Sequence, residues 1–200
     1  VHNEFLLVDR KKMSKSLKNF YTLDNLKEKK IDPMAFRYLC LQTHYRQQMN
    51  FTWDSLAAAN VAYKKLREYI VEFKLKNEDM MLSEEKLNLN EEFNKNFFNN
   101  ILDDLQTPQA VAVMWDMLKS DLPNHFKLEH LLKFDKILGL SLDSSVPEQI
   151  PNQVMNLAKE RLEVRKTNDF KKSDDLRKQI KKLGYEIKDT KQGFKLKKIS

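Results

Sequence analysis

The feature that most restricts the fold is a long apolar stripe between residues 52 and 73. Thr52 belongs to a residue type that caps helix N-termini. The apolar residues after it recur every three or four positions, at Leu56, Ala59, Tyr63, Leu66, Ile70 and Phe73. This spacing places them on one face of a helix of about six turns. Such a helix needs partners to cover its apolar face, and the stripe therefore predicts a helical layer in the middle of the chain.

More helices are predicted on both sides of this stripe. Asp32-Pro33 and Thr107-Pro108 each combine a cap with proline at the first helical position. After Pro33, the residues Met34, Tyr38, Leu41 and Tyr45 follow at helical spacing. Three glycines and five prolines in 200 residues are too few turn formers for an all-β protein. The other predicted helices are a short one capped by Thr22, one over 83–105, one closed by Gly139, and two over 154–166 and 170–183.

The end of the chain has a different pattern. Residues 185–198, "YEIKDTKQGFKLKK", alternate apolar and polar types around a glycine-containing turn, which predicts a small hairpin. Residues 140–153 are polar and proline-marked and are predicted to be a linker. The predicted fold is mainly α: an entry segment over 1–30, a helical bundle over 31–139, and a basic αα-β-hairpin module over 154–200.

Charge and cysteine content narrow the class of protein. There is no signal peptide and no apolar run near the ~18 residues of a membrane span. Cys40 is the only cysteine, so neither an intrachain disulfide nor a cysteine cluster for zinc is possible, and a cytoplasmic location is predicted.

Basic residues are concentrated at the two ends of the chain. Residues 155–200 hold 15 Lys or Arg against 7 Asp or Glu, and residues 1–30 hold 8 against 4. Basic ends suit a polyanion contacted at two places, but a solvated lysine-rich surface explains the charge equally well.

One short stretch carries chemistry. Residues 12–16, "KMSKS", place two lysines and two serines in a segment without a glycine-rich cradle. When the α-phosphorus of a nucleoside triphosphate is attacked, pyrophosphate leaves with added negative charge, which lysines on a mobile loop can stabilise. Ser14 and Ser16 can donate hydrogen bonds to phosphate or fix the loop. On these residues alone, an ordinary basic loop remains the stronger interpretation.

Four blocks in the chain resemble one known family. The stretch "FLLVDRKKMSKSLKNFYTLDNL" (5–26) resembles the second signature of class I aminoacyl-tRNA synthetases. Three later blocks are similar to segments of cysteinyl-tRNA synthetases, in the order that the family has them. They are "DPMAFRYLCLQTHYRQQMNFTWDSLAAA" (32–59), "FNNILDDLQTPQAVAVMWDM" (98–117) and "RKTNDFKKSDDLRKQIKKLGYEIKDTKQGFKL" (165–196).

The resemblance implies a function and a set of site residues. In that family the signature loop contacts ATP, bound with Mg, and the second lysine is its main phosphate ligand. Carried over, the catalytic residues are Lys12 and Lys15, and Ser14 and Ser16 also bind ATP. The implied reaction activates cysteine to cysteinyl-adenylate and transfers it to tRNA-Cys. The nucleic-acid contacts implied in the C-terminal module are Arg177, Lys178, Lys181, Asp189 and Phe194.

The resemblance also implies what lies elsewhere. The chain, which opens with Val1 in strand-like sequence, is expected to be the C-terminal portion of a longer, monomeric protein. Residues 1–30 would end a Rossmann catalytic domain that is mostly absent, and the zinc ligands of the family would lie upstream, with none in this chain. The segment alone is expected to be inactive. The alternatives are a non-catalytic tRNA-binding module and a ligase that joins cysteine to a small amine, against which the anticodon-like module argues.

Three positions depart from the family pattern. Lys18 stands where the family has glycine, so the loop conformation is uncertain at that position. Gln106 replaces an asparagine. Leu196 replaces a tryptophan that could stack on a base. Phe194 is a possible substitute for that tryptophan, although core packing is the favoured interpretation of Phe194.

The isolated histidines and tryptophans and an adjacent aspartate pair are predicted to have structural roles. Histidines without cysteine neighbours at ligand spacing do not indicate a metal site. Aspartates before a Thr-Pro pair cap or hydrogen-bond a turn more often than they form a catalytic dyad. These residues are His44, His125, His130, Trp53, Trp115, Asp103 and Asp104.

Overall fold

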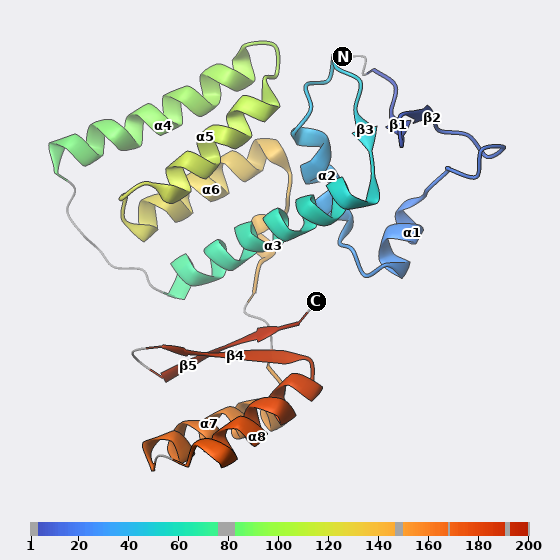
Figure 1. The fold of residues 1–200 in the computed structure, drawn as a ribbon. Helices are drawn as coiled ribbons and strands as arrows, with labels where there is room; N and C mark the ends of the chain where they lie inside the picture. The colour runs from blue at the N-terminus through green and yellow to red at the C-terminus, as the bar shows by residue number, and fades with distance from the viewer. Residues whose placement is uncertain (1–3, 76–82, 147–149, 168, 191–192, 200) are drawn as a thin grey trace. The chain divides into compact units, whose positions relative to one another are not determined.

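The computed structural model describes residues 4–75, 83–146, 150–167, 169–190 and 193–199 (Figure 1). The chain divides into two compact units, Val1–Pro147 and Glu148–Ser200. The mainly α prediction is confirmed, because helices dominate both units and the strands are short or form one hairpin. Among the described residues, no helix combines the length and the apolar character that crossing a bilayer would require. The finer division of the chain at residue 30 stays a prediction.

The first unit is built around the predicted central helix. α3 (Trp53–Leu75) begins after Thr52, whose Oγ1 accepts a hydrogen bond from the Ser55 N–H at 3.0 Å. Its apolar stripe is buried, and α2 (Pro33–Leu41) and α6 (Asn124–Leu138) pack against it. α4 (Glu84–Leu102) lies beside α5 (Thr107–Lys119), as Figure 1 shows. Two short elements, α1 (Leu23–Glu28) and the 3-10 turn η1 (Leu142–Ser144), complete the helical part of this unit.

Caps fix where these helices begin and end. Asp32 Oδ1 accepts from the Met34 N–H at 2.9 Å, and Ser83 Oγ caps α4. Gly139 ends α6 in the left-handed conformation, with φ of 65°. A Cβ at Gly139 would lie 2.7 Å from Arg37 Nη2, and Arg37 Nε donates to the Leu138 carbonyl at 2.7 Å. Glycine is therefore required here both for the backbone conformation and for the close approach of Arg37.

One predicted helix is too long. The segment that starts at Pro33 leaves the helix after Leu41, so the prediction that Tyr45 continues its apolar stripe is wrong. Tyr45 instead lies in the following turn, where its hydroxyl donates to Asp104 Oδ1 at 2.5 Å. A tertiary hydrogen bond stabilises the turn, which helical spacing alone could not reveal. The helix predicted over 83–105 likewise ends earlier, at Leu102.

The first unit also contains a small sheet. β1 (Leu7–Val8) pairs antiparallel with β2 (Lys11–Lys12) and parallel with β3 (Asn50–Phe51), in the order β2-β1-β3. Hydrogen bonds from the Leu7 N–H to the Met49 carbonyl (2.8 Å) and from the Asp9 N–H to the Phe51 carbonyl (3.0 Å) join segments forty residues apart. Of the strand-like stretch "EFLLVD" (4–9), Leu7 and Val8 form a strand, and Val1 lies outside the described residues. β3 was not predicted, because two residues are too short for an alternating pattern.

The second unit is the predicted αα-β-hairpin module. It consists of α7 (Asn152–Lys166), α8 (Phe170–Lys182), β4 (Tyr185–Thr190) and β5 (Gly193–Lys198), with β4 and β5 antiparallel. α7 begins inside the segment predicted to be the linker. The unit has its own apolar core, made of Val154, Ala158, Ile180, Tyr185 and Ile187.

Candidate functional site

The hairpin that leads into the lysine loop has an unusual turn. Asp9 and Arg10, between β1 and β2, both have positive φ, at 48° and 63°. This is the backbone pattern of a type I′ hairpin turn, which glycine and asparagine adopt more easily than arginine. Asn50 Oδ1 accepts from the Arg10 N–H at 2.7 Å. β3 therefore holds the turn from which Lys11 and Lys12 follow.

The lysine loop is closed at its base by one side chain. Asn19 Oδ1 accepts from the Ser14 N–H at 2.8 Å, and Asn19 Nδ2 donates to the Lys12 carbonyl at 3.0 Å. Ser14 Oγ accepts from the Leu17 N–H at 3.2 Å and lies 3.1 Å from Ser16 Oγ. Asn19, in the segment that leaves the loop, thus holds the backbone of Lys12 and Ser14 at the start of the loop. Sequence reasoning missed Asn19, which only its position shortly after a hydroxyl-rich loop could have suggested.

The two predicted catalytic lysines lie on this loop with exposed side chains. Lys15 Nζ is 5.8 Å from the centre of the Phe20 ring, within reach of a weak cation–π contact. Across the described ranges, neither Lys12 nor Lys15 forms an ion pair. Both ammonium groups can therefore bind an anion without first breaking an ion pair with a carboxylate. In this structure the two hydroxyls contact other groups of the loop itself. The predicted contacts of Ser14 and Ser16 with ATP stay predictions.

Lys18, where the family pattern has glycine, adopts the left-handed conformation that glycine favours. Its φ is 53°, and its N–H donates to the Lys15 carbonyl at 3.1 Å. A residue with a Cβ adopts this left-handed region at a cost of about 1 kcal/mol. The chain therefore makes a tight turn after Lys15 with a lysine at this position, which places a further positive charge beside the loop.

A cavity of about 300 Å³ lies behind the loop. Its walls are mainly apolar, and Met13 contributes to them from the loop itself. Tyr21 and Phe51 belong to its walls, and their rings pack with that of Trp53 at centre-to-centre distances of 5.0 to 5.9 Å. Met13 thus connects the loop to the first unit, whereas residues 15–18 are exposed. The other residues around the cavity are Leu6, Thr22, Leu23, Leu26 and Phe36.

The predicted structural roles of His44 and Asp104 are confirmed. His44 Nε2 lies 2.8 Å from the Asp104 carbonyl oxygen, and the Asp104 carboxylate accepts from Tyr45 and from Arg46 Nε at 2.8 Å. The hydrogen bonds from Tyr45 and then Arg46 hold the pKa of Asp104 below its usual range. Asp103 is the C-cap residue of α4. These contacts join the turn after α2 to the turn between α4 and α5.

The predicted nucleic-acid residues fall into two groups. Arg177, Lys178 and Lys181 lie on α8 with exposed side chains, and Lys178 pairs with Asp175 at 3.3 Å. Asp189 instead lies on β4 and binds two arginines of α7. Its carboxylate accepts from the buried Arg161 at 2.7 Å and from Arg165.

Asp189 and Phe194, both in the hairpin, have partners within the second unit. The hydrogen bond from Arg161 is the largest cause that lowers the pKa of Asp189. Phe194 is the strand partner of Asp189 and is half-buried, packed against the small core together with Leu196. The structure therefore brings the three α8 cations together on a helix surface, and it gives Asp189 and Phe194 contacts within the unit. Their predicted contacts with nucleic acid remain untested.

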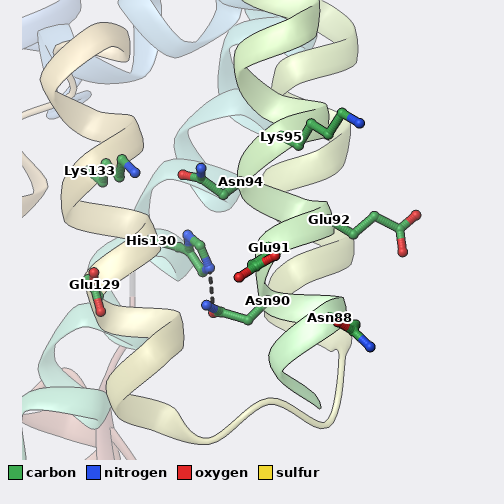
Figure 2. Close-up of a pocket in the computed structure, with 9 residues that line it drawn as sticks. All are labelled: Asn88, Asn90, Glu91, Glu92, Asn94, Lys95, Glu129, His130 and Lys133. Carbon is green, nitrogen blue, oxygen red and sulfur yellow. Dashed lines mark hydrogen bonds between the residues drawn. The ribbon is translucent and has the colours of Figure 1, made fainter. Parts of the chain in front are cut away.

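A second concave region lies between α4 and α6, with a volume of about 600 Å³ (Figure 2). His130 is 6% exposed, and its Nε2 lies 2.7 Å from Asn90 Oδ1, so Nε2 carries the proton. Two polar atoms, His130 Nδ1 and Asn94 Oδ1, have no partner and are closed off from solvent, so a molecule in the groove would not reach them. Among the described residues no three His, Cys, Asp or Glu side chains gather as metal ligands would.

We expect His130 to make the first unit less stable in mild acid. Burial lowers the pKa of His130 from its ordinary value of 6.5, with opposing effects of Glu129 and Lys133. His130 is therefore protonated less readily in the folded protein than in the unfolded chain. Its free energy of unfolding should be highest above pH 6.5 and fall as the pH drops below it, by at most about 1.4 kcal/mol per pH unit.

Urea unfolding between pH 5 and 7.5, followed by tryptophan fluorescence, measures this effect. Both tryptophans, Trp53 and Trp115, lie in the first unit. The variant His130→Leu should have a flatter dependence on pH than the original chain. Equal slopes for the two proteins would contradict the prediction.

Comparison with known proteins identifies the first part of the chain. The family described as "tRNA synthetases class I (C) catalytic domain" matches residues 1–61, which include the hairpin, the lysine loop and β3. The loop and this match define the class of protein, the class I aminoacyl-tRNA synthetases.

Relatives extend the similarity to the whole chain. The chain is 38% identical over 210 residues to a cysteine–tRNA ligase of Chlamydia abortus, which covers 99% of the chain and 44% of that protein. It is 35% identical over 213 residues to the cysteine–tRNA ligase of Borrelia hermsii, with 99% and 44% covered. A cysteine–tRNA ligase of Burkholderia lata is 34% identical over 199 residues, with 98% and 40% covered. The chain belongs to the cysteine–tRNA ligase family, and it spans less than half the length of these relatives.

Proposed function

We propose that the chain is the C-terminal portion of a cytoplasmic cysteine–tRNA ligase, which supplies the ATP loop and tRNA-binding surfaces of the enzyme. The observation that carries this proposal is the lysine loop. Lys12 and Lys15 are exposed and form no ion pair with any carboxylate that the structure describes, on a loop that Asn19 closes and β3 anchors. The relatives are cysteine–tRNA ligases over nearly all of this chain, which points to cysteine, ATP and tRNA-Cys as substrates.

The loop would act in the activation of cysteine. The cysteine carboxylate attacks the α-phosphorus of ATP, cysteinyl-adenylate forms, and pyrophosphate leaves with the electrons of the broken P–O bond. Lys15, and Lys12 behind it, would stabilise the charge that grows on the leaving phosphates. Mg would accompany the ATP phosphates as part of the substrate. The described residues contain no set of zinc ligands.

The second unit would bind the anticodon of tRNA, because residues 165–196 resemble the C-terminal anticodon-binding segment of the family. Residues 155–200 carry a clear excess of basic side chains, and Arg177 and Lys181 are exposed on one helix. Phosphate neutralisation by such residues releases counterions and makes affinity depend on salt. After adenylate formation, the cysteinyl group would pass to the terminal adenosine of the bound tRNA.

Binding of tRNA-Cys to the 200-residue chain tests this part of the proposal. We expect affinity to fall steeply with salt concentration, and the double variant Arg177→Ala/Lys181→Ala to reduce the slope of log K against log salt by about 1.5 to 2. Lys166→Ala is a matched control on α7, because Lys166 already pairs with Glu163 at 2.7 Å. Fluorescence anisotropy with labelled tRNA measures both quantities. Equal affinity for a tRNA with a replaced anticodon would contradict the role given to this unit.

A further inference from the structure

Residues 45–51 hold the hairpin that presents the lysine loop. The Glu4 N–H donates to the Tyr45 carbonyl at 3.1 Å, and the Leu7 and Asp9 N–H groups donate to the carbonyls of Met49 and Phe51. With the bond from the Arg10 N–H to Asn50 Oδ1, four hydrogen bonds join residues 4–10 to residues 45–51. Strands of two residues are not stable as an isolated hairpin, so these bonds set where the hairpin lies.

The other end of this segment is fixed by the helical bundle. Between Leu41 and Asn50 the chain has no helix or strand, and side-chain contacts to the bundle add to its backbone hydrogen bonds. Asp104, in the turn between α4 and α5, supplies them through its carboxylate to Tyr45 and Arg46 and through its carbonyl to His44. Tyr45 thus bonds Asp104 with its hydroxyl and residue 4 with its carbonyl.

We propose that Asp104 is a positioning residue for the signature lysines. It acts through Tyr45, Arg46 and β3 on the hairpin, and so couples the turn between α4 and α5 to the loop that carries Lys12 and Lys15. The part of this inference that concerns catalysis rests on the proposed function, whereas the structural part does not. Because Asp104 and Arg46 are both partly exposed, at 41% and 66%, a molecule that contacts the bundle at this turn can change the position of the loop.

Hydrogen exchange in the 200-residue chain tests the structural part. In Asp104→Ala, the amides of Leu7, Asp9 and Arg10 should exchange at least about tenfold faster, while amides in the buried α3 core, such as Leu66, stay protected. Asp103→Ala is the matched control, because the neighbouring aspartate lacks these contacts. Tyr45→Phe, which loses only the hydroxyl, should give a smaller increase in the same amides. Unchanged exchange of Leu7 and Asp9 in Asp104→Ala would overturn the proposal.

A double-mutant cycle in the full-length ligase tests the catalytic part. Asp104→Ala should lower kcat/KM for ATP in pyrophosphate exchange about tenfold when Lys15 is present, and have no further effect in a Lys15→Ala background. If Asp104→Ala lowered kcat/KM by the same factor with Lys15 and with alanine at that position, Asp104 would have a merely structural role. That result would overturn the proposal that Asp104 positions Lys15. If Lys15→Ala alone had no effect, the proposed function and the catalytic part would both fail, while the exchange experiment would still decide the structural part.

Discussion

Replacing Lys15 by alanine in the full-length ligase should lower the rate of cysteinyl-adenylate formation by about 100-fold or more. The loss of one preorganised donor to a developing charge has an effect of this size. Because the charge on the leaving pyrophosphate grows towards the transition state, kcat should fall more than KM rises. The exposed, unpaired ammonium of Lys15 and the closed loop beneath it are the physical basis of this expectation. Cysteine-dependent ATP–pyrophosphate exchange measures it.

The hairpin offers a matched control for this experiment. Lys11 precedes Lys12 on β2 and is equally exposed, but neighbouring strand residues direct their side chains to opposite faces. Lys11→Ala should therefore keep exchange near its original rate, and Lys15→Arg, which retains the charge, should recover part of the activity. Near-normal exchange in Lys15→Ala would remove the loop from the proposed mechanism.

Replacing Asp189 by alanine should destabilise the second unit by about 2 kcal/mol. Arg161 is 3% exposed and its guanidinium depends on the Asp189 carboxylate, while Arg165 adds a second positive charge nearby. Removing one partner of a buried ion pair typically costs about 3–5 kcal/mol, and partial exposure of Asp189 reduces this figure. Hydrogen exchange of the Ile180 and Ile187 amides measures the stability of this unit. Glu186→Ala, an exposed neighbour on β4, is the control and should change it by less than about 0.5 kcal/mol.

The same ion pair predicts a dependence on pH. The pKa of Asp189 lies below its ordinary value of 3.8 because Arg161 stabilises the carboxylate. The stabilisation is therefore complete above that value and is lost as the pH falls further, through the lowered pKa of the folded state. Unchanged exchange of both amides in Asp189→Ala would contradict the role of the pair.

The helices were predictable because their signals are local. The apolar stripe of α3 and the caps at Asp32, Ser83 and Gly139 lie within a few residues of the elements that they define. The second unit was also predicted correctly, since its two helices and its alternating hairpin each have a distinct period.

The candidate site was predictable only in part. Lys12 and Lys15 were assigned through the family resemblance of the blocks around and after them, because on the motif alone an ordinary basic loop was the stronger interpretation. The side chains that hold the loop, Asn19, Asn50 and Asp104, act through hydrogen bonds to residues 5 to 59 positions away, and such bonds leave no periodic trace. Tyr45 was assigned to a helix because its hydrogen bond to Asp104 cannot be read from helical spacing. The ion pairs of Asp189 join α7 to β4 and could not be predicted from either element alone.

The pairing of β1 with β3 imposes an order in time on the synthesis of this chain. The ribosome makes the lysine loop, residues 12–16, about 35 residues before Asn50 and Phe51, and domains fold as units once their segments have emerged. Until β3 has left the ribosome, β1 lacks one of its two partner strands, and the hairpin that leads into the loop is not anchored. A nascent chain stalled before residue 50 should therefore carry the whole motif without the hydrogen bonds to residues 49–51 that fix the hairpin.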